Sequence, residues 1–209
     1  MDQGALDEEK EPHFVLGKSR VNAMNYSGAI EAFEESLDIV RRLLAGETVV
    51  SSRRFTVTKA SIALRPAEPV EVWIGASAPP ALDRAARMAD GWIAGPGLTR
   101  EEARAQADFY RERCAAYGRR QTAIALRRDI YVGESSAEAQ RVLEQALSRG
   151  YRGIPAEALI AGSIDEVAEQ FHALGELGYS DVIVRHLTND QRKVLCSLER
   201  LEGVRAALG

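Results

Sequence analysis

The sequence lacks several features that would assign it to a particular class of protein. Its only two cysteines, Cys114 and Cys196, stand in no CxxC or CxxH spacing, so we expect no metal site and interpret both as small apolar side chains of helices. No apolar run reaches the roughly 18 residues that a membrane span needs. The first eleven residues are acidic and polar, unlike a secretory signal. These absences predict a cytoplasmic protein without a bound metal.

The sequence also lacks the excess of positive charge that is typical of nucleic-acid binding. Its 27 lysine and arginine residues are outnumbered by 31 aspartate and glutamate residues, which gives a formal net charge of −4. The arginines are scattered among glutamates along predicted helices, a pattern typical of solvent-exposed helix faces. We therefore expect small-molecule ligands and no nucleic-acid partner.

Predicted strands and helices alternate along most of the chain. The apolar runs that predict strands cover residues 13–17, 70–75, 92–94, 123–132 and 181–185, with a very short run at 159–162. Between them lie helical patterns, three of which begin with capping boxes, at Thr99/Glu102, Ser135/Glu138 and Ser163/Glu166. Such alternation predicts an α/β fold with a parallel sheet. The charged residues 1–12 predict a disordered tail, which leaves residues 13–209 as one domain.

Two architectures are compatible with this order, a doubly wound sheet and a (β/α)8 barrel. No G-x-G-x-x-G follows any predicted strand, which weakens the prediction of a dinucleotide-binding doubly wound sheet. A complete barrel needs about 250 residues. Five or six strands in 209 residues would therefore leave a barrel short by two or three βα units. An open barrel of this kind exposes two unpaired strand edges.

One stretch carries a specific resemblance. Residues 72–92, VWIGASAPPALDRAARMADGW, resemble the luciferase-like pattern of an apolar strand, Gly-(Gly/Ala)-Ser and a helix ending in Asp-Gly-Trp. The segments 161–167 and 177–182 resemble the approaches to the last helix and the eighth strand of that family, and the resemblance as a whole covers about residues 13–187. It implies a partial TIM (β/α)8 barrel of the luciferase-like type that lacks the first two or three βα units.

The same resemblance implies an oxidoreductase or monooxygenase that uses FMN or the deazaflavin coenzyme F420 on a small organic substrate. The sequence of residues 72–92 resembles the deazaflavin-dependent branch slightly more than the flavin-monooxygenase branch. A second hypothesis is a non-catalytic remnant that binds a flavin or self-associates, as in a homodimer. A third is a gene fragment or a misassigned start, because residues 1–12 do not resemble the preceding βα unit of the family.

The cofactor-binding residues implied by the resemblance are Gly75, Ala76 and Ser77. A glycine at the end of a strand lets the backbone approach a ligand closely, and a helix start presents amide hydrogens to an anion. Ser77 adds a hydroxyl donor, so these three residues would hold the phosphate of the cofactor. The alternative is structural: Ser77 caps its helix and Gly75 makes the turn.

The substrate-binding candidates are Arg185 and His186, which follow the last predicted strand. In a (β/α)8 barrel, side chains at this end of a strand reach the mouth where active sites lie. The alternative for His186 is a surface or hydrogen-bonded histidine. Asp90 is a further candidate, as an anchor beside the cofactor or simply as a helix stop. No catalytic residue can be assigned, since the family places its proton-relay groups on the strands that this sequence lacks.

Overall fold

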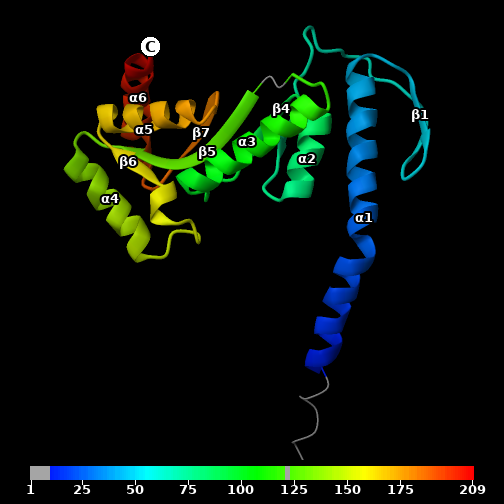
Figure 1. The fold of residues 1–209 in the computed structure, drawn as a ribbon, viewed down its shortest axis with the longest axis horizontal. Coiled ribbons are helices and arrows are strands. Elements are labelled where there is room, and N and C mark those ends of the chain that lie inside the picture. Colours follow the sequence, from blue (N-terminus) through cyan, green and yellow to red (C-terminus); the bar gives the residue numbers. More distant parts are fainter. Residues whose placement is uncertain (1–9, 121–122) are drawn as a thin grey trace, which may run out of the picture. The chain divides into compact units, whose positions relative to one another are not determined.

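The computed structural model describes the backbone of residues 10–120 and 123–209 and the side chains from residue 27 onward, with residues 121 and 122 left out. The chain divides into two compact units, residues 1–70 and 71–209 (Figure 1). Each unit has its own sheet. The second contains most of the segment with the luciferase-like resemblance.

The first unit is a long helix followed by a hairpin. Its helix α1 spans Lys10–Leu44, and the antiparallel strands are β1, Val49–Ser52, and β2, Thr56–Ala60. The buried carboxylate of Glu35 joins helix to hairpin, because it accepts hydrogen bonds from the Ser51 hydroxyl and, at 2.6 Å, from the Arg54 amide. These two bonds hold the pKa of Glu35 below its usual value, the serine bond contributing most.

The strand predicted over residues 13–17 is wrong, because this segment belongs to α1. A five-residue apolar run fits a strand and a buried helix segment equally well, so periodicity alone could not separate them. A helix satisfies its own backbone hydrogen bonds, whereas a strand needs a neighbour. Of the tail predicted over residues 1–12, the first nine lie outside the described residues and the last three begin α1.

The second unit alternates strands and helices as predicted. Its strands are β3, Trp73–Gly75; β4, Gly91–Ala94; β5, Ala123–Val132; β6, Ile160–Gly162; and β7, Asp181–His186. Its helices are α2, Pro79–Met88; α3, Arg100–Ala116; α4, Ser136–Ser148; α5, Ile164–Glu176; and α6, Gln191–Leu208, with a short 3-10 helix at Ala156–Ala158. Every strand pair in this sheet is parallel.

Strand β5 is the centre of the sheet. Its residues 123–126 pair with β4, residues 130–132 pair with β6, and residues 125–130 pair with β7. Because the β7 pairing overlaps both of the others, β4 and β6 share one edge of β5 and β7 occupies the other. Two serine hydroxyls extend the β7 edge: Ser180 accepts from the Ile124 amide at 3.0 Å, and Ser197 accepts from the Val132 amide at 2.8 Å.

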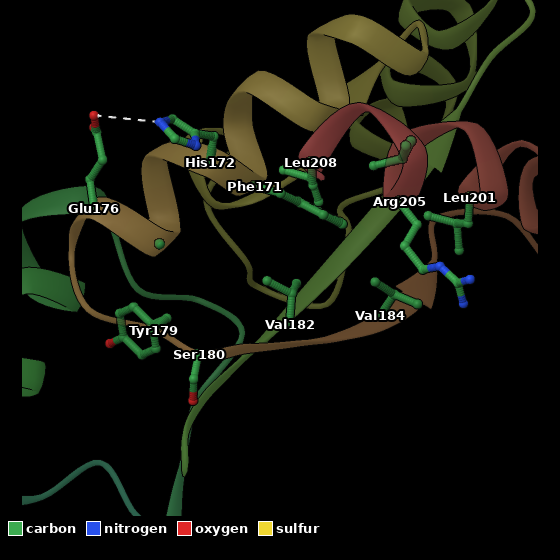
Figure 2. Close-up of a pocket in the computed structure, with 12 residues that line it drawn as sticks. Phe171, His172, Glu176, Tyr179, Ser180, Val182, Val184, Leu201, Arg205 and Leu208 are labelled. Carbon is green, nitrogen blue, oxygen red and sulfur yellow. Dashed lines mark ion pairs between the residues drawn. The ribbon is translucent and has the colours of Figure 1, made fainter. Parts of the chain in front are cut away.

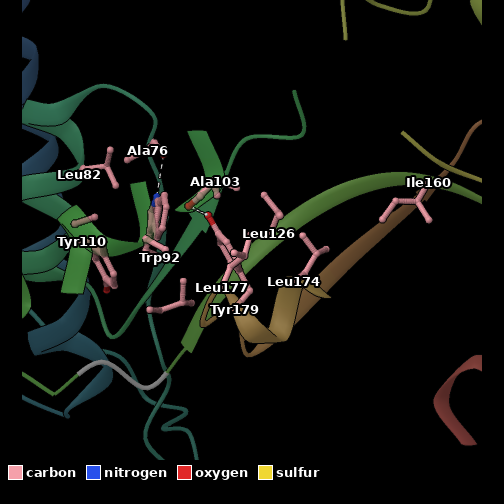
Figure 3. Close-up of a cluster of buried hydrophobic side chains, with 14 of the residues drawn as sticks. Ala76, Leu82, Trp92, Ala103, Tyr110, Leu126, Ile160, Leu174, Leu177 and Tyr179 are labelled. Carbon is pink, nitrogen blue, oxygen red and sulfur yellow. Dashed lines mark hydrogen bonds between the residues drawn. The ribbon is translucent and has the colours of Figure 1, made fainter. Parts of the chain in front are cut away.

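One face of the sheet carries four helices. The main core joins α2, α3, α5 and α6 to alternate strand residues such as Trp92 and Leu126 (Figure 3). The remaining helix, α4, packs on the opposite face, around Tyr131 at the far end of β5, in a second cluster.

With four of its five helices on one face, the sheet resembles the wall of a barrel more than a doubly wound sheet, in which helices cover both faces. The face opposite α2, α3, α5 and α6, called the inner face below, carries Gly75, Ile93, Ala125, Arg127 and Asp129, as the strand registers show. Among the described residues, β3 pairs only with β4 and β7 only with β5, so the wall does not close on itself. The fold is a partial (β/α)8 barrel, as predicted.

Two of the three predicted capping boxes are complete, at Thr99/Glu102 and Ser163/Glu166. The third is only half formed. Ser135 accepts from the Glu138 amide, but the Glu138 carboxylate accepts from the Tyr131 hydroxyl at 2.7 Å and from the Glu134 amide at 2.7 Å. Glu138 therefore ties α4 to the end of β5 rather than closing the box.

We predict that Ser197→Ala lowers the free energy of unfolding by about 2 kcal/mol, since it leaves the buried Val132 amide without an acceptor. Urea denaturation followed by circular dichroism measures the change. Ser148→Ala is the matched control, because the Ser148 hydroxyl is exposed and bonds only to the Gln145 carbonyl. Equal stability of the two variants would contradict the role given to Ser197.

Candidate functional site

The carboxyl end of β3 opens onto free space. Gly75 is the last residue of β3 and is exposed, the next residue Ala76 is buried, and Ser77 is exposed. A Cβ built on Gly75 would meet nothing nearer than the Ile93 carbonyl at 3.9 Å. A ligand can therefore approach the backbone here from the inner face.

The Ser77 side chain lies over the loop that follows β4. A Cβ built on Gly95 would lie 3.3 Å from the Ser77 Oγ, so a side chain at position 95 would crowd the hydroxyl. The N-cap of α2 is Ala78, without a side-chain capping bond, so Ser77 does not cap the helix. Within the described part of the chain the Ser77 hydroxyl has no hydrogen-bond partner, which leaves it available to a ligand.

The first four residues of α2 offer no free amide hydrogen to a ligand. Pro79 and Pro80 occupy the first two helical positions and have no N–H. The amides of Ala81 and Leu82 both donate to the Ala78 carbonyl at 2.9 Å. The Ala76 amide donates to the Ile93 carbonyl at 3.2 Å. Hydrogen-bond donation at this corner therefore depends on Ser77 rather than on the helix.

Trp92 fixes the turn between β3 and α2. Its indole Nε1 donates to the Ala76 carbonyl at 2.8 Å, and its ring is fully buried. The rings of Tyr110 and Tyr179 lie with centroids 5.1 and 6.1 Å from that of Trp92 (Figure 3). The sequence predicted Trp92 only as the first residue of a short strand, so its bond to the candidate site was missed.

Arg128 fixes the neighbouring loop. It lies within β5 with only 3% of its surface exposed. Its guanidinium donates to the carbonyls of Pro96 and Leu98, each at 2.9 Å. Burial lowers its pKa below the usual arginine value. Sequence reasoning missed this residue, although a charged pair, Arg127-Arg128, within an apolar strand was the available signal.

The inner face carries a buried carboxylate between β5 and the loop after α4. Asp129 is fully buried and accepts from Arg127 at 2.8 Å and from the Tyr151 hydroxyl at 2.8 Å. Burial, followed by the bond to Asp129, raises the pKa of Tyr151 to about 12. Arg185 is the register partner of Asp129 on β7 and is exposed. This cluster was not predicted as a unit.

The structure separates the two predicted substrate contacts. Arg185 points to the inner face with its register partner Asp129, and His186, the next residue along β7, points to the opposite face. The Nδ1 atom of His186 is buried without a hydrogen-bond partner in the described residues, and burial lowers the pKa of its imidazole. Asp90 accepts from the Val72 amide at 2.9 Å at the amino end of the sheet, away from Ser77.

A separate apolar cavity of about 510 Å³ lies between α5, α6 and β7 (Figure 2). Val182, Val184 and Leu201 line it, and His172 with Glu176 forms an exposed ion pair at its rim (Figure 2). The cavity lies on the helix-covered side of the sheet. It is therefore not part of the corner formed by Gly75 and Ser77.

Within the described residues there is no group of histidine, cysteine, aspartate or glutamate side chains suited to a metal ion. No helix in the same residues is long and apolar enough to cross a membrane.

The parallel sheet with four of its five helices on one face defines a protein of the (β/α)-barrel class. The family model for luciferase-like monooxygenases matches residues 17–182, and the chain belongs to that family.

The relatives include oxidoreductases of two cofactor types. An F420-dependent glucose-6-phosphate dehydrogenase of Nakamurella multipartita is 28% identical over 78% of this chain and 56% of its own length. An F420-dependent secondary alcohol dehydrogenase, solved with an F420-acetone adduct, superposes with a TM-score of 0.69 at 13% identity, over 84% of this chain and 60% of its own. The oxygenating constituent of 3,6-diketocamphane monooxygenase from Pseudomonas putida, solved with FMN, gives 0.66 at 15% identity, over 84% and 62%. The chain thus spans about three-fifths of the length of these relatives.

We predict that Trp92→Phe lowers the free energy of unfolding by about 2 kcal/mol, because it removes the bond to Ala76 and leaves a void between two tyrosines. Urea denaturation measures the loss. Trp73→Phe is the matched control, since Trp73 is only half-buried and its indole bonds the exposed Glu71. If Trp73→Phe cost as much as Trp92→Phe, the role given to the Ala76 bond would be wrong.

We predict that the free energy of unfolding decreases as the pH falls below about 6.5, in part because of His186. Burial lowers its pKa in the folded state, so the unfolded chain binds this proton more readily, and protonation favours unfolding. Denaturation midpoints between about pH 7.5 and 5.5 measure the trend. His186→Gln should reduce the slope, and an unchanged slope would show that His186 does not contribute.

Proposed function

We propose that the protein is an oxidoreductase that binds FMN or the deazaflavin coenzyme F420 and acts on a small organic substrate. Membership of the luciferase-like family supports the reaction class, and relatives of both cofactor types support the choice of cofactor. The observation that carries the proposal for this chain is the unpartnered Ser77 hydroxyl beside the open backbone of Gly75.

The residues present fit the phosphate end of such a cofactor. Ser77 would donate its hydroxyl to a phosphate oxygen, and the lack of a side chain at Gly75 would let the phosphate approach the strand end. Ala76 would not donate a hydrogen bond to the phosphate, because its amide already donates to the Ile93 carbonyl. Its carbonyl accepts from the Trp92 indole, so Ala76 would only fix the course of the backbone beside the phosphate. When bound, the cofactor supplies the redox chemistry by accepting or donating a hydride equivalent.

The substrate would face the inner side of the sheet. Arg185 is the predicted substrate contact whose side chain points there, and its guanidinium would orient a polar group of the substrate. His186 would act only indirectly, because it points to the helix-covered side of β7. We assign no proton donor or acceptor to the reaction.

The second candidate function is a flavin-binding protein without turnover. The observation that favours it is the open wall: the described strands offer one side of a barrel, with β3 and β7 each paired on one edge. Unpaired strand edges also favour self-association, so we propose a homodimer. Light scattering of the purified chain tests the mass of the particle. Turnover assays with bound FMN or F420 separate this candidate from the enzyme.

We predict that Ser77→Ala weakens the binding of FMN or F420 about fivefold, which corresponds to the loss of one hydrogen bond of about 1 kcal/mol. Quenching of tryptophan fluorescence measures the dissociation constant, with Trp73 as the reporter on the inner face. Ser77→Thr retains the hydroxyl and should bind more tightly than Ser77→Ala. Ser148→Ala is the control and should bind like the unmodified chain. Equal affinities for all four proteins would reject the phosphate contact.

A further inference from the structure

A second cavity, of about 390 Å³, lies where β5 and β7 end. Its walls come from the end of α4, the loop that follows α4, the loop after β7 and the first turn of α6. Parallel strands end on the same side of a sheet, so this cavity lies at the same end of the sheet as the turn that carries Ser77. That end of a (β/α)8 barrel is where its ligands bind.

Three cationic side chains line this cavity: Arg149, Arg152 and Lys193. Arg149 and Arg152 are exposed, Lys193 is half-buried, and in the described part of the chain none of the three forms an ion pair within 4.0 Å. This concentration of unpaired positive charge stands out in a chain whose net charge is −4. The three cationic side chains outnumber the one carboxylate that lines the cavity, Asp190, and an excess of one sign of charge attracts ligands of the other sign.

The acidic groups beside the cavity are already engaged. Asp190 lines it, but its carboxylate caps α6 by accepting from the amides of Arg192 at 3.0 Å and Lys193 at 3.2 Å. Glu138 is close enough for the charge of Lys193 to contribute to its low pKa, yet the largest contribution comes from its hydrogen bond with Tyr131. Neither carboxylate neutralises the two arginines.

The loop that carries Arg152 holds an uncommon backbone conformation. Arg152 has φ +53°, a left-handed value that few residues other than glycine adopt, and its neighbours Gly150 and Gly153 have φ +68° and +69°. The Arg152 amide donates to the Gly150 carbonyl at 2.9 Å, which closes a tight turn. The turn places two arginines, at positions 149 and 152, beside one cavity.

Tyr151 connects this cavity to the inner face. Its side chain lines the cavity, and its hydroxyl donates to Asp129 at 2.8 Å. Asp129 is bonded to Arg127 and is the register partner of Arg185 on that face. A ligand with one end in the cavity would therefore have its other end near the face where we place the substrate.

We propose that the cavity lined by Arg149, Arg152 and Lys193 binds a phosphate or carboxylate group of a small-molecule ligand, and that this ligand is the substrate. The second half of the proposal rests on the proposed oxidoreductase function. Cationic side chains form charge-assisted hydrogen bonds with either anion, and the arginines can bind either in a bidentate manner. The site is separate from the Ser77 corner, which we assign to the cofactor.

Isothermal titration of the full chain with inorganic phosphate, and separately with citrate, tests the anion site without any cofactor. We expect saturable binding that weakens as salt is added. Arg152→Gln and Lys193→Gln should each reduce the affinity at least fivefold. Arg141→Gln, on an exposed position of α4 outside the cavity, is the matched control and should leave the affinity unchanged. Absent binding, or equal binding by all variants, would overturn the proposal.

A second titration separates the two possible sources of the anion. Phosphate is titrated into the chain saturated with FMN and, in parallel, with F420. Undiminished phosphate affinity supports a substrate site, whereas loss of phosphate binding would assign the cavity to the cofactor and overturn that half of the proposal. If neither cofactor binds but phosphate still does, the oxidoreductase function fails and the anion site stands.

Discussion

The structure of the second unit depends on β5 being paired along both of its edges. β4 and β6 follow one another on one edge and β7 runs along the other, so one ten-residue strand orders three neighbours. The hydroxyls of Ser180 and Ser197 extend the β7 edge at its two ends, where backbone partners are missing. Because side chains alternate along the strand, the same ten residues contribute to the main core on one face and to the inner face on the other.

This alternation explains why charged residues occur within a strand that is otherwise apolar. Arg128 points toward the helices, where it holds the loop after β4 by two carbonyl oxygens. Arg127 and Asp129 point to the inner face and bond to each other. Each charge is therefore paired or hydrogen-bonded, which offsets the cost of its burial. The charged residues that interrupt this apolar strand therefore fix the loop after β4 and form the polar cluster of the inner face.

The sequence predicted the order of elements and the parallel sheet, because apolar periodicity and capping residues are local signals. Two complete capping boxes confirm this for α3 and α5. It could not predict α1, where five apolar residues fit two conformations. Nor could it predict the bond from Trp92 to Ala76 or that from Tyr151 to Asp129, which join residues 16 and 22 positions apart. Such contacts depend on the register of the strands, which local patterns do not specify.

The two prolines at the start of α2 have a consequence for how the neighbouring turn meets a ligand. Each proline fixes its own φ angle, and the residue before a proline is restricted as well, so the segment Ala78–Pro80 has little conformational freedom even in the unfolded chain. This segment would therefore lose little conformational entropy when a ligand binds against it. The segment Ala78–Pro80 is thus restricted before any ligand arrives, which would favour lock-and-key binding over induced fit at the adjoining turn.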